Sequence, residues 1–194
     1  MNFDHWRFTV RGVLMEWLRR PEHAIAAYTE AFRADPRDVQ AARSIAWVYA
    51  RQGRWQESVT WQEKALEIEP EHADTWFNLA YAQEQCGHRD AALACFQRVT
   101  ALKPEHDRAW YGIGMVHAHQ GDHAAASHAL QKAADLQPMN DPTWYALGMA
   151  CHHNHDPDGV KRVIEHCLTH TPVSARRLIK ETHRTDLMHL LPPE

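Results

Sequence analysis

The sequence predicts an all-α protein, built as a solenoid of five helix-turn-helix hairpins followed by a capping helix. Two observations lead to this fold: the chain repeats itself every 34 residues, and each repeat holds two apolar stripes with helical spacing. Composition agrees, because eight glycines among 194 residues leave few hairpin turns for an all-β fold. No low-complexity linker interrupts the chain, so we expect one continuous domain over residues 1–194.

The period is clearest in the prolines, five of which lie 34 residues apart, and columns of small and aromatic residues keep the same spacing. The columns are Pro36, Pro70, Pro104, Pro138 and Pro172; Gly12, Ala46, Ala80, Gly114 and Gly148; and Phe8, Ala42, Trp76, Trp110 and Trp144. Independent columns that stay in register over five copies define the repeats. We place them at residues 5–38, 39–72, 73–106, 107–140 and 141–174.

The fourth repeat shows how each repeat divides into two helices. Trp110 and Ile113 begin an apolar stripe along a predicted helix over residues 107–120. Gly121 ends this helix, and Asp122 is placed to cap the next one. Two helices joined by so short a turn lie antiparallel. Neither helix can bury its stripe alone, so the core must come from stacking of neighbouring repeats.

The last twenty residues follow the fifth repeat without continuing the pattern. Ile179, His183 and Leu187 are four residues apart, which indicates another helix face. Thr182 stands where a sixth repeat would need a small residue. We therefore expect a capping helix over residues 175–191 that covers the end of the fifth repeat, with a frayed tail as the alternative.

The columns together resemble the tetratricopeptide repeat (TPR) motif over residues 5–174. The residues that carry the resemblance are Trp76-x2-Leu79-Ala80, Trp110-x2-Ile113-Gly114, Trp144-x2-Leu147-Gly148, Ala24-x3-Tyr28, Ala92-x3-Phe96 and the five prolines. The first and fifth repeats depart from it, since Arg19 and His155 replace the glycine of the turn. The resemblance implies a right-handed superhelical solenoid whose concave face is lined by the first helix of each repeat.

The first helices carry a second stripe that faces away from the predicted core and is too apolar for a solvated surface. Aromatic residues, Met and Arg are enriched at protein interfaces, so we expect a groove that holds an extended or helical peptide. The alternative is that these side chains pack between adjacent first helices and close the surface. The predicted groove residues are the apolar Trp47, Phe77, Tyr81, Tyr111, Met115, Tyr145 and Met149 and the polar Arg43, Asn78 and Arg108.

The three polar groove residues can be compared with the carboxylate clamp of certain TPR proteins. Some TPR proteins grip the C-terminal carboxylates of heat-shock chaperones with a clamp of cationic and asparagine residues. Arg43, Asn78 and Arg108 approach that clamp, but Trp47 and Gly112 replace two of its five residues. The comparison therefore argues against a chaperone clamp, and ordinary interhelical ion pairs are the alternative for both arginines.

Charge and composition restrict the partners. Twenty-one Lys and Arg against twenty-five Asp and Glu give a net charge of −4, which argues against nucleic-acid binding. No apolar run is long enough to span a bilayer, and the chain shows no secretory signal. Four cysteines without a CxxC pair are typical of a reducing compartment. We therefore expect a cytoplasmic protein with neither nucleic acid nor membrane as a partner.

The sequence shows no catalytic motif such as GxSxG or a glycine-rich phosphate loop, and the cysteines fall near core stripes. We expect neither enzymatic activity nor a cofactor. His152, His153 and His155 cluster, and His166 and His170 have a spacing that can chelate Zn²⁺. Because no HExxH or CxxC pattern accompanies them, we expect no metal site, with metal binding as a minor alternative.

These inferences predict a non-catalytic protein-interaction module, an adaptor or chaperone that holds a peptide segment of another protein. The alternative is an assembly or scaffold factor that acts through self-association, by its convex surface or an open end.

The sequence also predicts where two tryptophans of the second repeat lie. Trp61 should pack between hairpins, and Trp55 should be partly exposed on the convex side.

Overall fold

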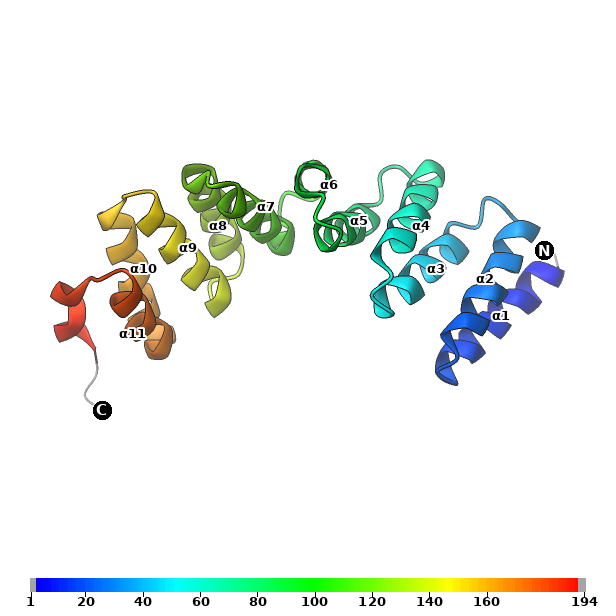
Figure 1. Ribbon diagram of the computed structural model, residues 1–194, viewed down its shortest axis with the longest axis horizontal. Helices are drawn as coiled ribbons and strands as arrows, with labels where there is room; N and C mark the ends of the chain where they lie inside the picture. The colour runs from blue at the N-terminus through cyan, green and yellow to red at the C-terminus, as the bar shows by residue number, and fades with distance from the viewer. Residues whose placement is uncertain (1–2, 192–194) are drawn as a thin grey trace. The chain divides into compact units, whose positions relative to one another are not determined.

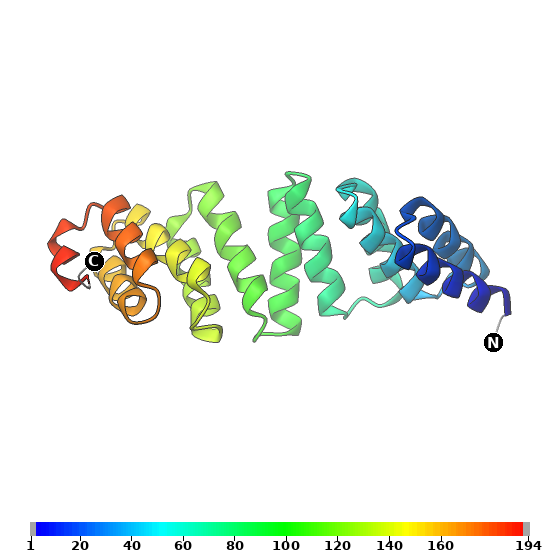
Figure 2. The same cartoon turned by 90° about the horizontal axis from the view of Figure 1, so that it is seen from below.

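The computed structural model describes residues 3–191, and over this range the chain is helical, with no strand. It forms two compact units, the first ending at Leu102 and the second beginning at Lys103. Each unit consists of antiparallel helical hairpins (Figures 1 and 2). No helix among the described residues combines the length and the apolar character needed to cross a membrane. The single continuous domain expected from the sequence stays a prediction.

The N-terminal unit contains three hairpins. Their helices are α1 (Phe3–Trp17) with α2 (Pro21–Ala34), α3 (Val39–Arg51) with α4 (Trp55–Ile68), and α5 (Ala73–Gln85) with α6 (Arg89–Leu102). The second helix of one hairpin packs on the first helix of the next, α2 on α3 and α4 on α5. At the α2–α3 junction, Ile25 and Tyr28 are buried against Ile45 and Val48. The hairpins thus share their core between neighbours, as the stripes predict.

The C-terminal unit contains two hairpins and the tail. Its helices are α7 (Asp107–Gln120), α8 (His123–Leu136), α9 (Asp141–His153), α10 (Pro157–His170), α11 (Pro172–Glu181) and the 3₁₀-helix η1 (Thr185–Leu190). Both α7 and the start of α8 agree with the predicted bounds, and Asp122 caps α8 by accepting a hydrogen bond from the Ala125 N–H. α11 packs on α9 and α10, where Leu178 and Ile179 are buried.

The predicted bounds of the capping helix, residues 175–191, are wrong at both ends. α11 begins earlier, at Pro172, whose fixed φ and missing N–H suit the first turn of a helix. It ends at Glu181, and His183 then adopts a φ of +55°, which a right-handed helix does not contain. The chain continues as η1, through which Leu187 still reaches the core.

The turns inside the hairpins explain why three repeats have a glycine between their two helices. Gly53, Gly87 and Gly121 have φ angles of +73°, +81° and +82°. Arg19 and His155 occupy the equivalent places and adopt φ angles of +55° and +56°. The end repeats therefore keep the left-handed turn although their residues carry a Cβ, which makes this conformation unfavourable.

A recurring hydrogen bond joins the tryptophan column to the proline column. In three repeats the indole N–H donates to the carbonyl oxygen of the proline six residues earlier, at 2.8 Å each time. This bond connects the start of the first helix to the loop before it. The tryptophan and proline columns therefore supply the donor and the acceptor of one recurring contact. The pairs are Trp76 with Pro70, Trp110 with Pro104, and Trp144 with Pro138.

Candidate functional site

The ten predicted groove residues divide between the two units, and all of them lie on first helices. Those on α3 and α5 are Arg43, Trp47, Phe77, Asn78 and Tyr81, and those on α7 and α9 are Arg108, Tyr111, Met115, Tyr145 and Met149. Each unit contains a pocket to which part of this set contributes. Three of the first five line a pocket in the N-terminal unit, and four of the second five line one in the C-terminal unit.

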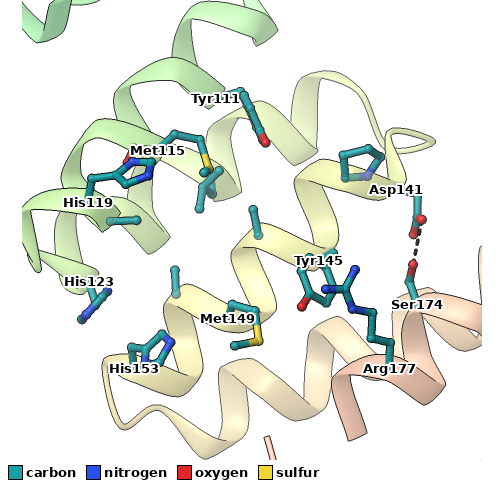
Figure 3. A pocket seen from close by; sticks show the side chains of 15 residues that line it. Tyr111, Met115, His119, His123, Asp141, Tyr145, Met149, His153, Ser174 and Arg177 are labelled. Atoms are coloured by element: carbon teal, nitrogen blue, oxygen red, sulfur yellow. Dashed lines mark hydrogen bonds between the residues drawn. The ribbon is translucent and has the colours of Figure 1, made fainter. Parts of the chain in front are cut away.

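The larger pocket, here called the α7–α9 pocket, has a volume of about 550 Å³. Tyr111 and Met115 reach it from α7, and Tyr145 and Met149 reach it from α9 (Figure 3). All four side chains are half-buried, so each keeps part of its surface open. The volume lies within the roughly 300–1,000 Å³ typical of ligand sites, and aromatic and Met side chains are usual in their walls.

Histidines line one end of the α7–α9 pocket. His119, His123 and His153 lie there together, with the rings of His123 and His153 4.9 Å apart (Figure 3). Nδ1 of His123 is buried and has no hydrogen-bond partner among the described atoms. The repeat columns place His119 and His153 at equivalent positions of the groove stripe, which predicts that their rings approach within the groove, and both residues line this end of the pocket. The end of the pocket therefore offers imidazole nitrogens to a ligand.

α11 forms the other end of the same pocket with Ser174 and Arg177. Ser174 donates a 2.7 Å hydrogen bond to Asp141, whose second carboxylate oxygen is buried without a partner among the described atoms (Figure 3). The Arg177 guanidinium lies 4.2 Å from the centre of the Tyr145 ring. From the sequence, this helix was expected only to cap the fifth repeat.

A small polar network fixes Tyr145 at this end. Its hydroxyl donates to the Glu181 carboxylate, and Arg177 Nε donates to the same carboxylate at 2.9 Å. Burial, and then the hydrogen bond to Glu181, raise the pKa of Tyr145. The hydrogen bonds from Tyr145 and Arg177 lower the pKa of Glu181. Tyr145 is thus held neutral and oriented, with its ring facing the pocket.

The smaller pocket, here called the α3–α5 pocket, has a volume of about 150 Å³. Trp47, Asn78 and Tyr81 line it as predicted groove residues, and Trp55 joins them. The rings of Trp55 and Tyr81 meet edge to face at 5.7 Å. Trp55 is half-buried, so the expected partial exposure is confirmed. It lies beside predicted groove residues and not on the convex side, because α4 packs on α5 and a side chain at its first residue reaches Tyr81.

The wall of the α3–α5 pocket contains two polar atoms that no described group satisfies. Ser58 Oγ and Gln62 Oε1 are buried and without a hydrogen-bond partner in the described part of the chain. A buried polar atom left unpaired costs about 1–3 kcal/mol, so a bound N–H or a water molecule would stabilise both. In the other repeats the equivalent positions of the second helix carry core residues, so the sequence did not indicate that Ser58 and Gln62 line a pocket.

Three predicted groove residues line neither pocket. Arg43 donates a 2.9 Å hydrogen bond to Thr75 Oγ1 and forms an ion pair with Glu69, as in the ion-pair alternative. The ring of Phe77 packs on Phe96 at 5.8 Å. Arg108 is exposed on α7, outside the pocket lining.

Several other histidines have packing or capping contacts. Nδ1 of His72 and of His106 accepts the backbone N–H three residues on, so these rings cap α5 and α7. The His166 ring stacks on Trp144 at 3.7 Å and on His170 at 4.5 Å. Within residues 3–191, no group of three or more His, Cys, Asp or Glu side chains is arranged to hold a metal ion.

The cysteines are free thiols, three of them buried: Cys95, Cys151 and Cys167. Burial raises the pKa of all three, that of Cys95 to about 11. A thiol with so high a pKa stays protonated at neutral pH, and the thiolate is the nucleophilic form. These three cysteines therefore act as small apolar groups of the core.

Comparison with known structures shows the same fold. The crystal structure of MamA protein superimposes with a TM-score of 0.81 at 20% identity, covering 100% of both chains. YrrB, described as a TPR protein with an unusual peptide-binding site, gives a TM-score of 0.77 at 20% identity, over 89% of this chain and 90% of YrrB. MamA from Desulfovibrio magneticus RS-1 gives 0.77 at 21% identity, over 96% and 99%. No curated protein matches the sequence significantly.

The family comparison rests on sequence alone. The tetratricopeptide repeat model matches residues 18–73 and 77–142, which together make up more than half of the chain. The second matched range contains both Trp110 and Pro104, which the hydrogen bond at the start of α7 connects. With its period, its hairpins and this match in agreement, the chain belongs to the tetratricopeptide repeat family.

Proposed function

We propose that this protein is a non-catalytic interaction module, an adaptor or chaperone that holds a peptide segment of a partner protein. The α7–α9 pocket is the observation that carries the proposal. Its four half-buried Tyr and Met side chains lie on the helices that the sequence assigned to a groove. The α3–α5 pocket provides a second, smaller site with the same kind of lining.

The chemistry of the α7–α9 pocket suits a peptide better than a small polar metabolite. Met115 and Met149 adapt to apolar side chains of different shape, since the thioether is flexible and polarisable. Tyr111 adds a rigid ring. Polar groups stand only at the two ends, where histidines and the Asp141–Ser174 pair can bind the peptide backbone. The likeness to YrrB, which is described as a TPR protein with an unusual peptide-binding site, supports a peptide as the ligand.

The proposal includes a cytoplasmic location. The four free cysteines would remain reduced there, and none of them has a disulfide in the structure. Buried thiols such as Cys167 fill core positions that a disulfide partner would disturb.

The experiment is a selection of random peptides displayed on phage against the intact protein. Peptides that are enriched are synthesised, and their affinity is measured by titration calorimetry for the wild type and for the Met115→Ala and Tyr111→Ala variants. We expect at least a tenfold loss of affinity in either variant, because each removes an anchor contact worth about 1.5–3 kcal/mol.

Met139→Ala is the matched control, because Met139 is 72% exposed in a loop outside the pocket. It should bind the selected peptides as the wild type does, and circular dichroism should show equal helix content in all variants. A selection that enriches nothing, or peptides that bind the pocket variants undiminished, would contradict the proposal.

A further inference from the structure

The first helix of the chain presents an apolar stripe that the described part of the protein does not cover. Seven of the fourteen large apolar side chains that are exposed belong to the first eighteen residues, and each is between 45% and 78% exposed. Large apolar patches on soluble proteins mark sites of association. The seven residues are Phe3, Trp6, Val10, Val13, Leu14, Trp17 and Leu18.

The equivalent residues of the next hairpin show that this stripe is special to α1. Most of them are polar, and the equivalent of Leu14, which is Val48, is 3% exposed because α2 covers it. On α1 most of the polar positions are replaced by apolar ones. The α3 residues in the register of Phe3, Trp6, Val10, Val13, Leu14 and Trp17 are Arg37, Gln40, Ser44, Trp47, Val48 and Arg51.

The spacing within the stripe is that of a two-helix seam. Phe3, Trp6, Val10, Val13 and Trp17 follow each other at alternating intervals of three and four residues. This is the heptad pattern by which one helix packs along another. The opposite side of α1 is already occupied, because it packs on α2.

The area of the stripe is of the size that a stable interface requires. With aromatic side chains of about 150–250 Å² and smaller aliphatic side chains, the exposed parts of the seven residues amount to roughly 500–850 Å². A standard interface buries about 800 Å² on each partner. A single helix with this surface can therefore support a dimer.

We propose that α1 of a second copy of this chain covers the stripe, antiparallel to the first, with the two-fold axis at Val10. The axis pairs Phe3 of one copy with Trp17 of the other and Trp6 with Leu14, and it places Val13 opposite Arg7. The smaller Val10 side chains meet at the centre. A surface that is complementary to itself in this way forms a closed, isologous dimer. The dimer is independent of peptide binding, since the stripe lies outside the α3–α5 and α7–α9 pockets.

The mass in solution, measured by sedimentation equilibrium from 1 to 100 μM, tests the association. The wild type should be a dimer, and Val10→Lys should be a monomer with unchanged helical circular dichroism, because a charge at the axis faces its own copy. Val173→Lys is the matched control: Val173 is 83% exposed on α11, and this variant should remain dimeric.

Disulfide trapping in a Cys86→Ser background tests the orientation. Val10→Cys should form a linked dimer on oxidation, whereas Trp17→Cys should not, because antiparallel packing separates the two copies of that residue by roughly 20 Å. A monomer at every concentration would overturn the inference. So would a Val10→Lys variant that stays dimeric, a linked Trp17→Cys dimer, or a monomer that binds a different protein through α1.

Discussion

Single residues hold the hairpin turns in a conformation that their side chains disfavour. His155 has a φ of +56° where three other repeats have glycine. Replacing it by glycine removes the Cβ clash of about 1–2 kcal/mol, less the extra backbone entropy that glycine loses on folding. We expect His155→Gly to raise the free energy of unfolding by about 0.5–1 kcal/mol in urea titrations. Asn154→Gly, at a φ of −81°, is the control and should bring no gain.

At Gly114 two helices approach each other closely, and here we expect a substitution to lower the stability. A Cβ there would lie 2.5 Å from Leu130 Cγ and 3.3 Å from the Ala126 carbonyl oxygen. Although alanine favours helices, the overlap should make Gly114→Ala about 1–3 kcal/mol less stable.

A double-mutant cycle with Leu130→Ala checks this cause. If the Leu130 side chain produces the overlap, the two losses of unfolding free energy will not add, because the shortened side chain makes room for the new methyl group. Additive losses would mean that the backbone of α8, and not the Leu130 side chain, resists the substitution.

At the scale of the elements, the end of α9 should respond to pH. Burial, and then the charges of His153, His183 and His155, lower the pKa of His152 on the last turn of this helix. In the unfolded chain the same residue titrates near 6.5, so below that pH the unfolded state binds more protons. The contribution of His152 to stability is therefore present at pH 7.5 and decreases as the pH falls through 6.5.

Melting curves at pH 7.5 and 5.5 measure this effect. We expect the wild type to lose melting temperature over this interval, and His152→Asn to lose less, because it cannot be protonated. An equal loss in both proteins would assign the pH dependence to other groups. The variant also leaves the lining of the α7–α9 pocket intact, since His152 is not part of it.

At the scale of the molecule, the 34-residue repeats explain how much of the fold could be predicted from the sequence. The columns repeat the same information in each copy, so the helix bounds in repeats such as 107–140 agree with the structure closely. The tail lies outside the period, and the early end of α11 depends on the left-handed turn at His183, which no glycine signals. The direction of Trp55 depends on the packing of α4 against α5, which the spacing of residues alone does not contain.

The division into two compact units gives a prediction for the whole chain. One core cluster of the C-terminal unit, which includes Leu130, Leu147 and Ile164, consists of residues from α8 to η1. Every residue that lines the α7–α9 pocket also lies after residue 103. Since stability in repeat proteins comes from each hairpin and its immediate neighbours, residues 103–194 should fold alone.

Expressed separately, this fragment should show helical circular dichroism, a cooperative melting transition and the same affinity as the full chain for peptides that select the α7–α9 pocket. A fragment that folds but binds these peptides tenfold more weakly would mean that the N-terminal unit contributes to the site. A fragment without a cooperative transition would show that its core depends on residues before 103. The fragment contains every residue that lines the α7–α9 pocket, so the missing part would be packing and not the site.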